Sequence, residues 1–168
     1  MTIVSKVTLE QLLASRDNRR LRQQELLSEW CGKTLVCLTV IMPGSEKRNA
    51  TSLIIAHEAC VALLRLFKSS VLFSEERDLV TGYELYLVVD RPIMKVKEAV
   101  CDIEDRHPLG RLFDIDVITP AGEPLSRQSV GREPRRCLIC GKEARYCMRN
   151  RSHTTEELIA RINDIVET

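Results

Sequence analysis

One stretch decides the fold of this 168-residue chain: His107-Pro108-Leu109-Gly110-Arg111-Leu112-Phe113-Asp114-Ile115-Asp116-Val117. Its second half alternates acidic with apolar residues, which is typical of a β-strand and places Asp114 and Asp116 on one face. Two close carboxylates raise each other's pKa unless a divalent cation or arginines compensate their charge. An imidazole, a glycine and a guanidinium precede them, at His107, Gly110 and Arg111. The stretch predicts either a cation and phosphate site or the solvated face of an edge strand.

Outward from this stretch, hydrophobic patterns predict six elements in the order strand, helix, strand, strand, helix, strand. They cover residues 34–41, 53–67, 71–80, 83–89, 92–105 and 111–118. This is the order of the split βαβ, or ferredoxin-like, arrangement, an α+β fold with an antiparallel sheet. Its first and last strands are neighbours, so Met42-Pro43-Gly44 should lie near His107 to Arg111. The alternative is a nucleotidyltransferase-like mixed sheet, although no Gly-Ser pair precedes Asp114.

The chain fits one domain, 1–168, with an N-terminal helical segment at 1–32, an α+β core at 33–120 and an Arg/Cys-rich extension at 121–168. Thr8 and Gln11 form a capping box at the first helix, and a polar run at 15–20 leaves open whether there is one helix or two. The helix at 53–67 is expected to turn an apolar stripe that includes Ile54 and Leu64 toward the core.

Composition bounds the class of protein. The apolar share is 44% and the charged share 29%, as in ordinary globular proteins, and no apolar run approaches the roughly 20 residues of a membrane span. Residues 1–6 lack the pattern of a secretory signal. Seven cysteines, an odd number, fit reduced thiols better than a paired framework. We therefore expect a cytoplasmic protein that has no membrane partner.

Basic residues concentrate in the C-terminal part of the chain, although the net charge is only +1. Between residues 127 and 151, two glutamates oppose eight basic residues: Arg127, Arg132, Arg135, Arg136, Lys142, Arg145, Arg149 and Arg151. A polyphosphate would be attracted to this segment. Nucleic acid is not expected as a partner, because aromatic residues make up only 4% of the chain and none alternates with the basic residues.

Four residues of the tail, Cys137, Cys140, Cys147 and His153, have the ligand types of a structural Cys3His zinc site. The gap of six residues after Cys140 is short for such a site, so half-buried thiols beside a turn, or a disulfide, are alternatives. The other cysteines lie in apolar patterns and are expected in the core: Cys31, Cys37, Cys60 and Cys101.

The stretch 107–117, continued by Ile118-Thr119-Pro120 and by the run 135–140, resembles the apo-citrate lyase phosphoribosyl-dephospho-CoA transferases, also called holo-citrate lyase synthases. The match extends to residues 13–17 and to the tail at 147–153, and so covers nearly the whole chain. The resemblance implies a nucleotidyltransferase-type reaction. A phosphoribosyl-dephospho-CoA unit would pass from triphosphoribosyl-dephospho-CoA to a serine of the acyl carrier (gamma) subunit of citrate lyase, with release of pyrophosphate.

Roles for individual residues follow from this chemistry. Asp114 and Asp116 would hold Mg²⁺, and His107 or one of the aspartates would take the proton of the serine. Arg111 would join them as a catalytic residue. Four residues would bind substrate: Arg16, Gly110, Arg135 and Arg136. The alternative is a non-catalytic assembly factor that binds the acyl carrier subunit and has no use for two carboxylates on one strand face.

Overall fold

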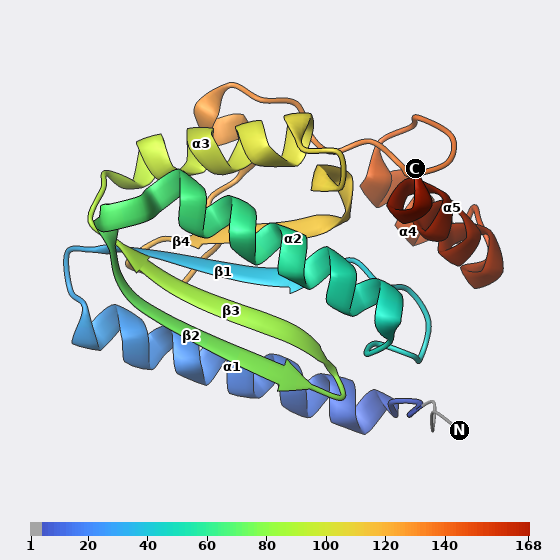
Figure 1. The fold of residues 1–168 in the computed structure, drawn as a ribbon, viewed down its shortest axis with the longest axis horizontal. Helices are drawn as coiled ribbons and strands as arrows, with labels where there is room; N and C mark the ends of the chain where they lie inside the picture. Colours follow the sequence, from blue (N-terminus) through green and yellow to red (C-terminus); the bar gives the residue numbers. More distant parts are fainter. Residues whose placement is uncertain (1–4) are drawn as a thin grey trace.

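The computed structural model describes residues 5–168 as an α+β structure with a four-stranded antiparallel sheet (Figure 1). Residues 1–4, part of the segment without a signal pattern, lie outside the described residues. The strands are β1 (Thr34–Val40), β2 (Val71–Leu79), β3 (Gly82–Val89) and β4 (Phe113–Ile118). The longer helices are α1 (Leu9–Glu29), α2 (Ala50–Phe67), α3 (Ile93–Arg106), α4 (Ala144–Asn150) and α5 (Thr155–Glu167). Short 3-10 turns are η1 (Lys68–Ser70), η2 (Gly110–Leu112) and η3 (Arg127–Val130).

The strand order is β2-β3-β1-β4, and every neighbouring pair is antiparallel. The predicted pairing of the first and last strands is confirmed, because Val40 lies opposite Phe113. Just beyond that pair, the Ile41 N–H donates to the carbonyl of Leu112 at 3.0 Å. The exit of β1 therefore meets the entrance of β4, as the predicted topology requires.

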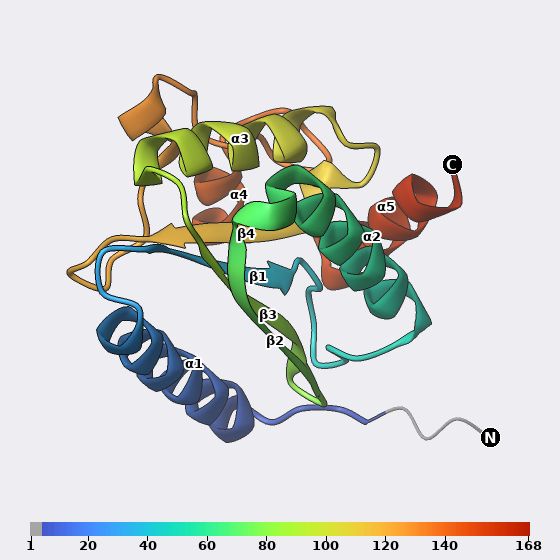
Figure 2. The ribbon, with the colours of Figure 1, turned by 60° about the vertical axis from the view of Figure 1, so that its left-hand side comes forward.

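Helices cover both faces of the sheet (Figure 2). Alternate residues of β1, such as Val36 and Leu38, belong to the larger core beneath α2 and α3. Leu35 and Cys37 pack on the opposite face against Leu26 of α1. This alternation explains why a continuous apolar run forms the central strand.

α1 is a single helix, which settles the question left open by its polar middle. Its capping box at Thr8 and Gln11 is present as predicted. The expectation of four core cysteines is wrong for Cys31, which is exposed because it lies in the turn after the C-cap residue, Trp30.

α2 buries only part of the predicted stripe, since Ala56 and Phe67 of that stripe are buried but two other members are not. Ile54 and Leu64 are 49% and 40% exposed, whereas Ile55 and Leu63 are fully buried. The segment Ala50–Ser70 is, by length and composition alone, long and apolar enough to cross a membrane, contrary to the expectation that no run approaches that length. Its buried residues belong to the same core as residues of the sheet, which is the arrangement of a core helix.

Candidate functional site

A cavity of about 800 Å³ lies beside β4, the edge strand. β4, α3 and the connection after β4 all contribute to its walls. The charged residues that line it include Lys97, Glu104, Arg111, Asp114, Asp116 and Arg135. Met42 and Pro43 also line it, so the predicted approach of this turn to Arg111 is observed.

Asp114 and Asp116 share the face of the sheet that faces α1. Their cross-strand partners are Thr39 and Cys37, and the Thr39 hydroxyl donates to Asp114 Oδ2 at 3.3 Å. Burial and, to a smaller extent, the charge of Asp114 raise the pKa of Asp116 to about 6, against the opposing effect of Lys97. A raised pKa is expected for a carboxylate that is buried beside a second carboxylate.

The raised pKa of Asp116 has a consequence for stability. Between about pH 4 and about pH 6, the folded state keeps a proton on Asp116 that the unfolded state has lost. The free energy of unfolding should therefore fall as the pH rises through this window, by at most about 3 kcal/mol. Asp116→Asn should remove this fall, so in chelator the variant should be more stable than the parent protein at about pH 7.5.

Urea unfolding at about pH 4.5 and about pH 7.5 checks this expectation, with the exposed Glu123→Gln variant as the control. An Asp116→Asn protein whose stability changes with pH as the parent's does would contradict it.

Arg135 is fixed against the entrance of β4. Its guanidinium donates to the carbonyls of Phe113, at 2.5 Å, and Gly110, at 2.8 Å. It also pairs with Glu104 at 3.2 Å, and Arg127 pairs with the other carboxylate oxygen of Glu104 at 3.0 Å. Burial raises the pKa of Glu104 despite these arginines. The buried carboxylate therefore organises two arginines at the cavity wall.

Arg111 lies between this cavity and a second hollow of about 380 Å³. It donates twice to the carbonyl of Arg136, at 2.9 and 2.6 Å. Burial and, to a smaller extent, the charge of Arg135 lower the pKa of Arg111 to about 10. Five arginines line the hollow, which also contains Glu104, Asp105 and Glu133: Arg111, Arg127, Arg132, Arg135 and Arg136. A cluster with this excess of guanidinium groups suits a polyphosphate.

Gly110 and His107 have positions that serve packing. A Cβ on Gly110 would overlap the backbone carbonyl oxygens of Ile103 and Glu104, so α3 and η2 can approach this closely only at glycine. His107 Nδ1 accepts the N–H of Leu109 at 3.0 Å, and its ring lies 4.9 Å from that of Phe113. Neither residue is among those that line the cavity.

Arg16 lies apart from the other predicted substrate-binding residues. It lines a third hollow, of about 360 Å³, together with Arg19 and Lys47. Asp114 borders both this hollow and the main cavity. Arg16 and Arg19 of α1 therefore share a hollow with one member of the aspartate pair.

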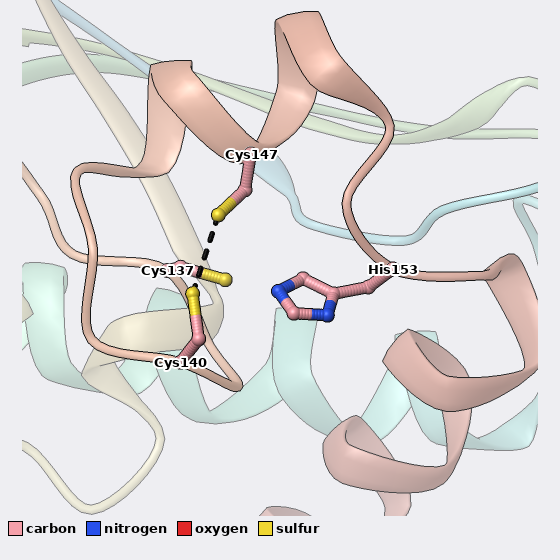
Figure 3. Close-up of side chains that lie close together, drawn as sticks. All are labelled: Cys137, Cys140, Cys147 and His153. Atoms are coloured by element: carbon pink, nitrogen blue, oxygen red, sulfur yellow. Dashed lines mark hydrogen bonds between the residues drawn. The ribbon is translucent and has the colours of Figure 1, made fainter.

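The four residues of the predicted metal cluster converge (Figure 3). The ligand atoms of Cys137, Cys140, Cys147 and His153 all lie within 4.8 Å of one another. The Sγ atoms of Cys140 and Cys147 are 3.3 Å apart. This group could bind a metal ion, because its donors have the spacing of a small tetrahedral site.

Comparison with known proteins identifies the family of the chain. A family model described as apo-citrate lyase phosphoribosyl-dephospho-CoA transferase matches residues 7–168. The chain belongs to this family. The family member of Citrobacter koseri is 35% identical over 163 residues, and that of Shigella boydii is 37% identical over the same length. In both cases the match covers 95% of this chain and 88% of the relative.

A longer protein is also similar. Protein CitXG of Haemophilus influenzae is 34% identical over 166 residues, or 97% of this chain, but the chain spans only 36% of that relative's length. The resemblance of the sequence to the apo-citrate lyase phosphoribosyl-dephospho-CoA transferases is therefore confirmed, and the cavity described above is that of a family member.

Sequence reasoning missed two charged residues in this family member's cavity. Lys97 and Glu104 are 4% and 7% exposed and lie on α3. They stand four and eleven residues after Ile93, on the stripe that includes Val100, and so occupy the helical spacing of the apolar face. The signal that could have identified Lys97 and Glu104 is a charged residue at the helical spacing of an apolar face.

Proposed function

We propose that this chain transfers a phosphoribosyl-dephospho-CoA unit from triphosphoribosyl-dephospho-CoA to a serine of the citrate lyase acyl carrier (gamma) subunit. In this reaction the serine Oγ forms a bond to the phosphorus nearest the ribose, and the bond from that phosphorus to the pyrophosphate oxygen breaks. The serine proton goes to a carboxylate, and pyrophosphate leaves. Family membership and the names of the relatives support this proposal.

One observation carries the proposal: the aspartate pair and the arginine cluster border the same cavity. Asp114 and Asp116 lie in its wall, and Arg111 and Arg135 stand between it and the arginine-lined hollow. Phosphoryl and nucleotidyl transfer depend on positioning and on charge stabilisation. The cavity therefore offers both carboxylates and guanidinium groups to one ligand.

The aspartate pair fits Mg²⁺. Carboxylate oxygens are hard donors, and Mg²⁺ is commonly held by one or two carboxylates together with substrate phosphates. A cation held between the two carboxylates would offset the repulsion that, together with burial, raises the pKa of Asp116. When bound, Mg²⁺ would stabilise the negative charge that develops on the phosphate oxygens.

The arginines act on the leaving group in this proposal. Arg111 and Arg135 are held by carbonyl oxygens and by Glu104, so they can offer donors to pyrophosphate without reorganising. Arg136 is exposed and pairs with Glu133 at 3.2 Å, so it can turn toward the hollow at little cost. Arg16, on the third hollow, would bind another part of the precursor.

The proton acceptor is one of the aspartates rather than His107. His107 Nδ1 is occupied by the Leu109 N–H, and the ring packs against Phe113. We expect His107→Gln to keep the transfer rate within about tenfold of the parent, since a general base contributes roughly 10² or more. Initial transfer rates with the purified carrier subunit check this expectation. A fall in the transfer rate of about 10², with unchanged folding, would show that His107 is the proton acceptor.

The remaining features belong to the same proposal. We assign the α+β core to the ferredoxin-like class on its strand order, and the chain to a single domain. The cytoplasm is the proposed compartment, which is supported by the seven free cysteines, all in the described part of the chain. A Zn²⁺ in the Cys3His cluster is the proposed structural cofactor, because the four ligand atoms lie within 4.8 Å of one another.

Transfer assayed with purified carrier subunit, precursor and a Mg²⁺ titration tests the proposed function. We expect incorporation of the prosthetic group to require divalent cation and to release pyrophosphate. A protein that binds the carrier but transfers nothing, at any Mg²⁺ concentration, would favour the assembly factor instead.

A further inference from the structure

We propose that Cys137, Cys140, Cys147 and His153 bind one Zn²⁺ ion and that this ion holds the wall of the arginine-lined hollow in place. The proposal rests on geometry in the tail of the chain and stands whether or not the transfer reaction is as proposed above. Three thiols would release their protons to solvent, and three thiolates and one neutral imidazole would bind the ion.

The four donor atoms have the spacing of a tetrahedral site. Zinc bonds of about 2.3 Å to sulfur and about 2.0 Å to nitrogen place ligand atoms about 3.5 to 4 Å apart. The donors here lie within 4.8 Å of one another, and Cys140 Sγ lies 3.3 Å from Cys147 Sγ. Small shifts of these side chains would complete the tetrahedron.

His153 supplies an independent observation. Its Nε2 is buried and has no hydrogen-bond partner among residues 5–168, and Figure 3 shows the imidazole edge turned toward the three sulfur atoms. Its Nδ1 lies 3.8 Å from Glu157 Oε2. A metal-bound histidine is commonly oriented by a carboxylate at its other nitrogen. An orphaned Nε2 that faces three thiols is explained by a metal ion.

The backbone around the thiols also fits metal binding. The Ile139 N–H donates to Cys137 Sγ at 3.4 Å, and such donors stabilise a thiolate. Gly141, directly after the second cysteine, has a φ of 71°, in the left-handed region that favours glycine. The chain therefore turns back after Cys140, so that Lys142 O accepts the Cys137 N–H at 2.6 Å.

This turn is continuous with the arginine wall. The Ala144 N–H donates to the carbonyl of Arg135 at 2.9 Å, and the backbones of Arg136 and Glu143 pair as an isolated antiparallel β-bridge. The carbonyl of Arg136 in turn accepts both hydrogen bonds of Arg111. Because Cys137 directly follows these two arginines, an ion that fixes Cys137 to α4 and to His153 also fixes the backbone that positions Arg111.

Zinc content of the full-length protein is the first measurement. Protein purified without chelator should contain about one zinc per chain by elemental analysis. Cys140→Ser should lower this content severalfold, whereas Cys31→Ser, which replaces an exposed cysteine outside the cluster, should leave it unchanged. Glu157→Gln, which can still form the capping box with Thr154, should weaken zinc affinity by roughly tenfold or more.

Thiol reactivity and hydrogen exchange give readouts that do not depend on transfer. Zinc should protect the exposed Cys140 from alkylation relative to Cys31, and chelator should abolish that protection. Chelator should also speed exchange of the Cys137 and Ala144 amides. Protein purified without chelator that contains no zinc and whose Cys140 reacts as fast as Cys31 would overturn the proposal, as would a Cys140–Cys147 disulfide in protein isolated under reducing conditions.

The two proposals fail in distinguishable ways. If the protein binds zinc but transfers nothing, the metal site stands and the proposed function falls. If it transfers the prosthetic group without zinc and with unchanged exchange at Cys137, the zinc proposal falls and the proposed function stands.

Discussion

Asp116→Asn should lower the rate of transfer to the carrier subunit by roughly 10² or more, because it removes one of two charged oxygen ligands while keeping the side-chain shape. Asp114→Asn should have a similar effect, since both residues lie on one face of β4 and line one cavity. Single-turnover transfer at saturating precursor and Mg²⁺ is the measurement. Binding of the carrier subunit should survive both changes.

The control for this experiment is Asp78→Asn, which changes an exposed carboxylate on β2 that pairs with Arg48 and lines none of the three hollows. It should leave transfer within a few-fold of the parent. The stability measurement adds a second check, because Asp116→Asn should inactivate the protein while making it more stable at neutral pH. Near-parental turnover by Asp116→Asn would refute the role given to the aspartate pair.

Glu104→Gln should lower the free energy of unfolding by about 3 kcal/mol, because it leaves Arg127 and Arg135 partly buried without their shared carboxylate. The side chain of Glu104 is only 4% exposed, and those of the two arginines are 13% and 18% exposed. The buried carboxylate also lies 3.5 Å from the Ile115 N–H of β4. Urea unfolding at neutral pH measures the change.

The neighbouring Asp105 offers the matched comparison. It contacts the same Arg127 at 2.7 Å but is 44% exposed, so Asp105→Asn should cost less than about 1 kcal/mol. Equal losses for the two variants would show that burial of Glu104 does not set the strength of this network.

The sequence predicted the topology because its strands carry strong local signals. The continuous apolar run of β1 predicted a buried strand, and the alternation in β4 predicted that Asp114 and Asp116 share one face. The metal cluster was predictable from cysteine and histidine spacing, because the ligand types restrict the chemistry. Convergence of these four side chains then followed in the structure.

Other features depended on tertiary contacts that no local pattern contains. Part of the α2 stripe was misplaced because this helix has apolar residues on several of its faces. Only packing on the sheet selects Ile55 and Leu63 for burial over Ile54 and Leu64. The connection after β4 carries arginines whose partners, such as Glu104 for Arg135, lie 31 residues away in sequence. The sequence alone does not indicate which of these arginine side chains are buried and which are exposed.

Crystals soaked with Mn²⁺ and pyrophosphate test the central claim most directly, since anomalous scattering locates the cation. We expect Mn²⁺ bound by the carboxylates of Asp114 and Asp116, at close to the roughly 2.1 Å of Mg²⁺–oxygen bonds, with pyrophosphate against Arg111 and Arg135. Mn²⁺ at another site, or pyrophosphate bound only beside Arg16, would contradict the account.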